Sequence, residues 1–471
     1  MSALSTTAAP SRVAYRSLAV ASVDELVYGK APNPICVGRG LEIGSGTVVP
    51  EINFTLPPID INETTWPEIR RQYASMIDGV CTRAVALEAP GLLVEFETLP
   101  PMTNRPEWGA EITSILAERI HEASDRYGLK AALRLTPNDS RDHIRPPKMR
   151  SGPYWDSMCR LFDLAGPSGA DLIAIESTGG KEICDEGLMN ADLRTMIFAL
   201  GVLAPRDMEF LWSHIVSVCR GAGITPAGDT ACGFANTAMV LAEQRMVPRV
   251  FAAVVRVASV PRGLVAYECG AVGPSKDCAY EGPYIKAITG APISMEGRSA
   301  ACAHLSSVGN ISQAVCDCWS NESVQNVRLL SAYAPTVSLE QLVYDCRLLN
   351  RASAGGDSDR LRMRNWLVES DSALDPQAYV LRPDVVMRIS AEIIKEENPY
   401  LRTRNAVAAA LAELKSAQAS GELRIAGNEV KWMDRMCRAA DSLPDSEEAM
   451  CESMRDQLQD APYLPSEYGL A

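Results

Sequence analysis

Short apolar runs alternate with amphipathic segments across residues 47–335 of the chain. Most of the runs are uninterrupted, which is typical of parallel strands that are buried on both faces. Strands are predicted in this way at residues 48–54, 92–97, 130–136, 171–176, 224–229, 264–268, 292–296 and, on a weaker pattern, 324–330. Helical patterns lie between them, for example at residues 108–127, 208–219 and 235–246. Eight β/α alternations over this length predict an α/β fold, a TIM (β/α)8 barrel.

A doubly wound open sheet is the alternative, but no Gly-x-Gly-x-x-Gly follows the first predicted strand. We therefore expect residues 47–335 to form the barrel, preceded by a partly mobile extension at residues 1–46. Residues 336–471 read as helical and are expected to pack on the barrel as an extension. Helices within that part are predicted at residues 361–368, 383–394 and 406–414.

Charge and cysteine usage limit the partners and the compartment. The 45 Lys and Arg residues against 59 Asp and Glu give a net charge of −14, which argues against nucleic acid and against a polybasic membrane contact. The longest apolar stretch, residues 250–260, contains Arg256 and is too short to span a bilayer. No signal peptide is evident in the first 30 residues, and 14 scattered cysteines fit a reducing compartment. We expect a cytoplasmic protein.

Several common kinds of catalytic site are absent from the sequence. There are four histidines, of which His304, after the seventh predicted strand, has the position most typical of a site, and there is no His-Glu-x-x-His motif. The Gly-x-Ser-x-Gly elbow of serine hydrolases and the Cys-x-x-Cys pair of zinc ribbons are also missing. Cys316 and Cys318 fall on a predicted helix and are interpreted as buried thiols.

Three residues beyond successive predicted strands have the composition of a metal site. Glu176 follows the fourth strand, Cys232 follows the fifth, and Cys278 lies in the loop after the sixth. The loops after barrel strands meet over one mouth, where a carboxylate and two thiolates can hold zinc with a fourth position open. Spacing alone nevertheless favours the alternative of two core thiols and a surface glutamate.

Longer motifs resemble those of the methanol:corrinoid methyltransferases. The motifs that carry the likeness are Glu176-Ser-Thr-Gly-Gly-Lys-Glu182, Ala227-Gly-Asp-Thr-Ala-Cys-Gly-Phe-Ala-Asn-Thr-Ala-Met239, Leu264-Val-Ala-Tyr-Glu268, Gly270-Ala-Val-Gly-Pro-Ser-Lys-Asp-Cys278, Met295-Glu-Gly297, Cys302-Ala-His304 and Cys316-Asp-Cys-Trp-Ser-Asn-Glu-Ser-Val324. They occur in the family's order, and the likeness extends over almost the whole chain after about residue 25.

The resemblance implies a TIM-barrel subunit that holds one zinc ion and works with a separate corrinoid protein, whose cobalt receives a methyl group. Carried over motif by motif, the zinc ligands are Glu176, Cys232 and Cys278. Cys269 departs from the family pattern and is expected to line the same loop without replacing Cys278. A homodimer within a hetero-oligomer is expected, and residues 319–324 are interpreted either as a docking rim for the partner or as barrel packing.

The implied chemistry explains this ligand set. Methanol resists attack at carbon because hydroxide is a poor leaving group, and zinc stabilises the developing charge on oxygen as a Lewis acid. Two thiolates and a carboxylate leave the zinc site with a formal charge of −1, which moderates the metal. The departing oxygen also needs a proton, and Asp229, Glu268 and Glu281 are the predicted donors or relays. A different methyl donor, such as a methoxylated or methylated compound, and a non-catalytic zinc scaffold are the alternatives.

Overall fold

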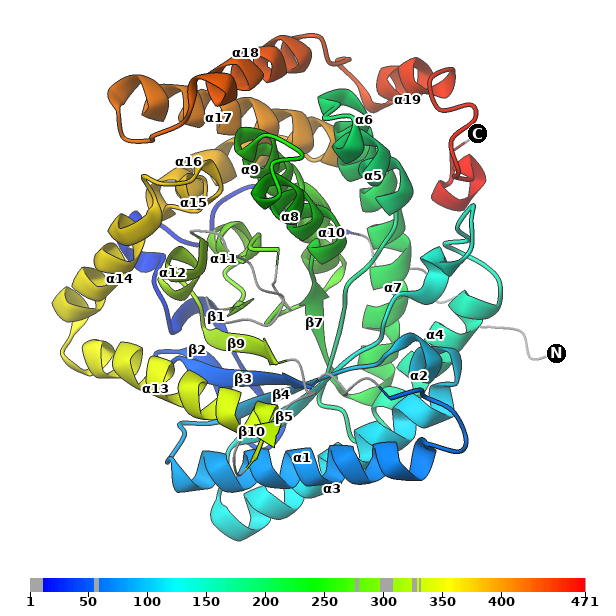
Figure 1. Cartoon of the computed structure of the whole chain (residues 1–471), viewed down its shortest axis with the longest axis vertical. Coiled ribbons are helices and arrows are strands. Elements are labelled where there is room, and N and C mark those ends of the chain that lie inside the picture. The colour runs from blue at the N-terminus through cyan, green and yellow to red at the C-terminus, as the bar shows by residue number, and fades with distance from the viewer. Residues whose placement is uncertain are drawn as a thin grey trace.

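The computed structural model describes residues 12–54, 59–275, 279–296, 308–323, 328–329 and 332–470. Its central sheet has seven parallel strands in the order β7-β6-β5-β4-β3-β9-β8 (Figure 1). The strands are β3 (Val49–Phe54), β4 (Leu92–Glu97), β5 (Ala131–Thr136), β6 (Leu172–Ile175), β7 (Thr225–Asp229), β8 (Ser294–Glu296) and β9 (Cys318–Ser323). The predicted TIM-barrel-like α/β fold is confirmed.

A short segment at residues 272–275 joins the two ends of this sheet. The backbone N–H groups of Val272 and Gly273 donate to carbonyls of β7 at 2.9 and 2.7 Å. Ser275 forms a parallel bridge to Ile293, just before β8. The segment therefore occupies the sixth strand position and closes the ring of strands.

Two of the predicted strands are wrong. Residues 264–268 belong to helix α10 (Val260–Cys269), which is buried on all sides, and a short apolar run of this kind cannot be told from a buried helix by its periodicity. The eighth strand is β9 and precedes the predicted range 324–330. The helix expected around Cys318 is also wrong, because the largely polar segment Cys318–Ser323 forms strand β9. Trp319 in β9 is buried and donates to Asp345 at 3.3 Å, so this side chain serves barrel packing.

Helix α9 (Arg249–Ala258) continues through one turn residue into α10. Together they form the 21-residue helix Arg249–Cys269, which is long and apolar enough to cross a membrane, contrary to the prediction for this stretch. All of its most apolar part is buried inside the protein, as in the core helix of a globular fold.

At the amino-terminal ends of the strands the barrel interior is apolar, and a hairpin covers it. Strands β1 (Lys30–Val37) and β2 (Leu41–Ser45) pair in antiparallel fashion. Val37, Leu41 and Ile43 of this hairpin cluster with inward side chains of the barrel strands, among them Val49 and Leu93. Part of the expected N-terminal extension thus covers the amino-terminal end of the barrel.

The next layer of the interior is charged. Arg134 on β5 is fully buried, pairs with Glu51 and lies 3.6 Å from Glu95. The same guanidinium donates to the carbonyl of Pro274 in the sixth strand position at 2.9 Å. Polar side chains therefore line the barrel as it opens toward the carboxyl ends of its strands, where chemistry is found in this fold.

Helices surround the strands and extend beyond them. The longer ones are α1 (Trp66–Ala86), α3 (Pro106–Tyr127), α4 (Pro153–Ala165), α5 (Lys181–Met189), α7 (Ala204–Ala222), α11 (Gly282–Thr289), α13 (Ala334–Ala354), α14 (Asp357–Asp371), α16 (Pro383–Ile393), α17 (Pro399–Ser420), α18 (Gly427–Asp441) and α19 (Glu447–Arg455). Shorter ones are α2 (Pro100–Asn104), α6 (Leu193–Phe198), α8 (Thr237–Glu243), α12 (Val308–Gln313) and α15 (Pro376–Tyr379). Helices at the predicted ranges 108–127, 208–219, 361–368, 383–394 and 406–414 are confirmed.

The C-terminal helices begin and end at the residues that helix chemistry favours. The side chain of Asn398 accepts from the backbone of Leu401 at 3.1 Å and caps α17, which then starts with Pro399. The helix ends at Gly421, whose φ of 82° is left-handed. Helices α15 to α18 lie against α9 and α11 (Figure 1), whereas α13 packs on β3, β9 and α1 and so belongs to the outer layer of the barrel.

Candidate active site

Glu176 directly follows strand β6 and opens the loop that leads to α5. It is half-buried, and its backbone pairs with that of Asn138 beyond β5, so it lies at the carboxyl end of the barrel. Two glycines shape the loop. Gly180 has a φ of 82°, and a Cβ on Gly179 would lie 2.3 Å from the carboxylate of Asp207. Gly180 therefore adopts a positive φ that other residues adopt only with strain, and position 179 has no room for a side chain.

Two buried carboxylates hold this loop. Asp229 at the end of β7 accepts from the backbone N–H and the hydroxyl of Ser177, at 3.3 and 3.1 Å. Asp139 accepts from the backbone N–H and the hydroxyl of Thr178, at 2.8 and 3.0 Å. The two residues after Glu176 are thus each fixed twice, which gives the candidate ligand a defined position.

Asp139 is in turn part of a buried ion cluster. Arg141 donates to both oxygens of Asp139 at 2.8 Å and to both oxygens of Asp207 at 2.8 and 2.9 Å. All three side chains are inaccessible to solvent. Burial opposes ionisation, but the Arg141 guanidinium and the hydrogen bonds outweigh it and hold the pKa of Asp139 below its ordinary value. The loop of Glu176 is therefore anchored on a fixed charge.

Cys232 is the first residue of the helical segment η4 (Cys232–Asn236), which follows β7 and leads into α8. Its side chain is half-buried, and its sulfur lies 3.3 Å from the amide nitrogen of Asn236. The start of a helical segment favours a negatively charged group, as a thiolate is. The preceding residue, Ala231, donates its backbone N–H to both oxygens of Glu281, at 3.1 and 3.2 Å.

Arg262 on α10 joins the loops of the two candidate ligands. Its guanidinium lies 2.9 Å from Asp229, donates to the hydroxyl of Ser177, and is 4.0 Å from Glu281. Asp229 also accepts from the indole N–H of Trp212 at 2.9 Å. The structure thus brings Asp229 and Glu281 into one buried network between Glu176 and Cys232.

Glu268 lies elsewhere, because it is on a helix and not at the end of a strand. It pairs with Arg402 at 2.6 Å and with Arg12 at 3.3 Å. Helix α10 leads into the sixth strand position and runs opposite to the strands. Six residues of helix place Glu268 about 9 Å below Arg262, toward the amino-terminal end of the barrel. The expectation that Glu268 has a strand-end position is wrong.

Cys269 is next to Glu268, so the expectation that it lines the candidate metal loop is also wrong. It is buried at the end of α10, and burial raises its pKa to about 11. Burial likewise raises the pKa of Cys81 and of Cys219 to about 12, so these thiols remain protonated and serve packing.

Cys278 and His304 lie outside the described residues. Within the part of the chain that the structure describes, no group of three or more His, Cys, Asp and Glu side chains is placed to hold a metal ion. Glu176 and Cys232 both stand at the carboxyl end of the barrel, on adjacent strands β6 and β7. A carboxylate and a thiolate at one mouth are donors that zinc accepts, so these two residues fit the predicted metal.

Two site residues escape prediction from the sequence. Arg262 gives one signal, a charge within an apolar helical stretch, which implies a buried partner. Asn53 near the end of β3 is 1% exposed, and neither of its amide atoms has a hydrogen-bond partner among the described residues. Its register with Glu95 places it on the inward face of the barrel. Its place within the predicted strand 48–54 does not show which face of the strand it occupies.

The C-terminal end of the chain contacts the loop of Glu176. The hydroxyl of Tyr468 accepts from the backbone N–H of Gly180 at 2.9 Å and donates to Glu182 at 2.7 Å. Burial raises the pKa of Glu182 to about 7. A carboxyl group near the candidate ligand therefore changes its charge close to neutral pH.

Glu182→Gln is expected to change how stability depends on pH. Because the pKa of Glu182 is about 7 in the folded protein and 4.5 ordinarily, its contribution is fully present below pH 4.5 and is lost as pH rises through 7. The wild type should lose up to ~3 kcal/mol over this range that the variant retains. Urea denaturation of both proteins at pH 5 and pH 8 measures the difference. Parallel losses in the two proteins would contradict the assignment.

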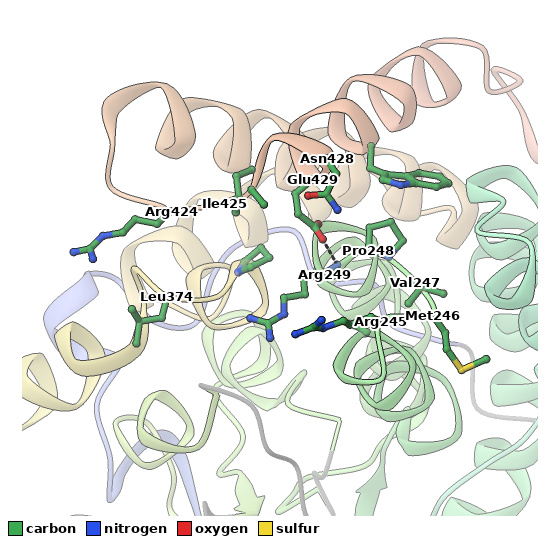
Figure 2. Close-up of a pocket in the computed structure, with 14 residues that line it drawn as sticks. Arg245, Met246, Val247, Pro248, Arg249, Leu374, Arg424, Ile425, Asn428 and Glu429 are labelled. Carbon is green, nitrogen blue, oxygen red and sulfur yellow. Dashed lines mark hydrogen bonds between the residues drawn. The ribbon is translucent and has the colours of Figure 1, made fainter.

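A pocket of about 580 Å³ lies away from these loops. Figure 2 shows it between the turn before α9 and the start of α18, with Arg245, Arg249 and Glu429 among its lining residues. Glu429 accepts from the first two backbone N–H groups of α9, at 3.2 and 2.9 Å. Arg249 precedes Arg262 by 13 residues on one helix, or about 20 Å. The pocket is therefore distinct from the candidate active site.

Comparisons with known proteins agree over nearly the whole chain. The family model for the methanol-cobalamin methyltransferase B subunit matches residues 12–469. The methanol--corrinoid protein co-methyltransferase of Methanosarcina barkeri (strain Fusaro / DSM 804) is 36% identical over 435 residues, which are 92% of this chain and 93% of the relative. The crystal structure of the methanol:cobalamin methyltransferase complex MtaBC from Methanosarcina barkeri contains a chain that superposes with a TM-score of 0.92 at 34% identity, covering 97% of this chain and 99% of that one.

Proposed function

Since the chain belongs to the methanol-cobalamin methyltransferase B subunit family, we propose that it transfers the methyl group of methanol to the cobalt of a corrinoid carried by a partner protein. In this reaction the C–O bond of methanol breaks, a Co–C bond forms, and the oxygen takes up a proton and leaves as water. The observation that carries the proposal is the position of Glu176 and Cys232 after adjacent strands at one end of the barrel.

Glu176, Cys232 and Cys278 would hold a zinc ion at this end of the barrel. A zinc ion bound there supplies Lewis acidity toward the alcohol oxygen. The chain's own contribution is to keep the ligands in place. Ser177 and Thr178 fix the carboxylate side through Asp229 and Asp139, and Glu281 fixes the thiolate side through Ala231.

The three carboxylates predicted to move the proton have different surroundings. Asp229 accepts three hydrogen bonds from Ser177 and Trp212 and is paired with Arg262, so its role is to position the loop. Glu268 is paired with Arg402 at the other end of α10. Glu281 contacts the residue before Cys232 and is the group to which we assign the proton for the departing oxygen.

Glu281→Gln is expected to lower kcat by about 10²- to 10⁴-fold, because the amide still accepts from Ala231 but cannot supply a proton. The matched variant Glu268→Gln should keep the wild-type kcat. Steady-state rates with methanol over a range of pH measure both. Full turnover in Glu281→Gln would remove this residue from the proton path.

The proposal is tested by combining the purified chain, the reduced corrinoid protein and methanol, and following the absorbance change of cob(I)amide to methylcobamide. Methylation that requires methanol supports it. Methylation from a methoxylated or methylated amine compound, with none from methanol, would favour the alternative donor. A metal-free chain with full activity would refute the zinc chemistry.

The proposal also includes a compartment and an assembly. All cysteines within the described ranges are free thiols, which supports a reducing cytoplasm. We expect two copies of the chain to pair within the complex with the corrinoid protein, and analytical ultracentrifugation of the chain alone and with its partner tests this.

A further inference from the structure

Arg262 is a fully buried arginine in the first turn of α10, which packs against α7 and β7 (Figure 1). Burying a guanidinium is unfavourable unless its charge and N–H groups meet partners. Two of the partners of Arg262, Asp229 and Ser177, lie 33 and 85 residues away along the chain. They therefore depend on the tertiary structure and not on the local sequence.

One side of the guanidinium reaches the loop of Glu176. It donates to the hydroxyl of Ser177 and lies 3.4 Å from the carbonyl oxygen of the same residue. It also lies 2.9 Å from Asp229, which binds Ser177 independently. Ser177, the residue next to the carboxylate ligand, thus forms a closed set of mutual contacts with Arg262 and Asp229.

The other side reaches the loop of Cys232. It lies 4.0 Å from Glu281, which accepts from Ala231 immediately before Cys232. The guanidinium also lies over the ring of Phe234, two residues after Cys232, with its carbon 5.0 Å from the ring centroid. The guanidinium of Arg262 therefore interacts with groups that hold the chain just before and just after Cys232.

We infer that Arg262 is a positioning residue that sets the distance between Glu176 and Cys232 by joining their two loops through one rigid guanidinium. The inference rests on the proposed zinc site. The residues behind metal ligands commonly contribute 10- to 100-fold to metal affinity, and a planar fork joins two partners in a way that a lysine ammonium cannot.

Arg262→Lys tests the inference with the charge retained. Zinc affinity of the full chain is measured by competition with a chromophoric chelator. We expect binding to weaken about 10- to 100-fold. The matched control is Arg402→Lys, a fully buried arginine that pairs with Glu268 at the other end of α10, and its zinc affinity should equal that of the wild type.

If the wild type binds zinc and Arg262→Lys binds it with the same affinity, the inference is overturned and the proposed function is unaffected. An equal loss in Arg402→Lys would overturn it too, because a general effect on the fold would then explain both. If Arg262→Lys does not fold, Ser177→Ala removes one contact without leaving an unpaired charge and should weaken zinc about tenfold. Unchanged affinity there would also overturn the inference. A wild type that binds no zinc would refute the proposed function itself.

Discussion

Cys232→Ala is expected to contain less than a tenth of an equivalent of zinc and to lose methanol-dependent methyl transfer by about 10³-fold or more. The variant removes one of three proposed ligands, and Lewis acid assistance contributes several kcal/mol to the barrier, at 1.36 kcal/mol for each factor of ten. Metal analysis of the purified protein and the methanol-dependent rate with the corrinoid protein measure the two losses.

Cys219→Ala is the matched control for this variant. Cys219 is a buried thiol on α7, and burial raises its pKa to about 12, so it is not expected to bind zinc. Its replacement should leave the zinc content and the rate per folded molecule unchanged. Zinc retained in Cys232→Ala, or lost equally in both variants, would mean that the ligand assignment is wrong.

Arg141→Met is expected to lower the free energy of unfolding by about 3 to 5 kcal/mol. The substitution leaves Asp139 and Asp207 buried without the cation that both of them contact. Because Asp139 also holds Thr178, the loop of Glu176 should open more readily. Urea denaturation at pH 7 measures the free energy, and limited proteolysis reports on the loop.

Arg388→Met is the control for this second effect. Arg388 is half-exposed and pairs with Glu413 at 2.6 Å on the surface of the helical extension, where an ion pair contributes at most about 1 kcal/mol. Equal losses of stability in the two variants would contradict the view that Arg141 compensates buried charge.

The strands that the sequence predicts correctly share one property. Those at 48–54, 92–97, 130–136, 171–176, 224–229 and 292–296 are short and mostly rich in apolar residues, and burial in a parallel sheet favours that composition. The sixth position is missed because the preceding run 264–268 is more apolar, although it belongs to α10, whereas residues 272–275 are few and contain Gly273 and Pro274. Strand β9 was displaced because Cys318–Ser323 is largely polar.

The same reasoning separates the predicted site residues. The strand-end positions of Glu176, Asp229 and Cys232 are predictable because the carboxyl ends of parallel strands meet at one edge, so a polar residue after an apolar run has a defined place. Glu268 was misplaced because its strand is a helix. Arg262 could not be placed, since its contacts with Ser177 join segments 85 residues apart and depend on how α10 packs.

X-ray absorption at the zinc edge of the purified protein tests the central claim most directly. The account predicts about one zinc per chain with two sulfur neighbours near 2.3 Å and light atoms near 2.0 to 2.2 Å. Addition of methanol should change the light-atom shell and leave the two sulfurs in place. A shell of nitrogen and oxygen atoms alone, or a catalytically active protein without zinc, would contradict the account.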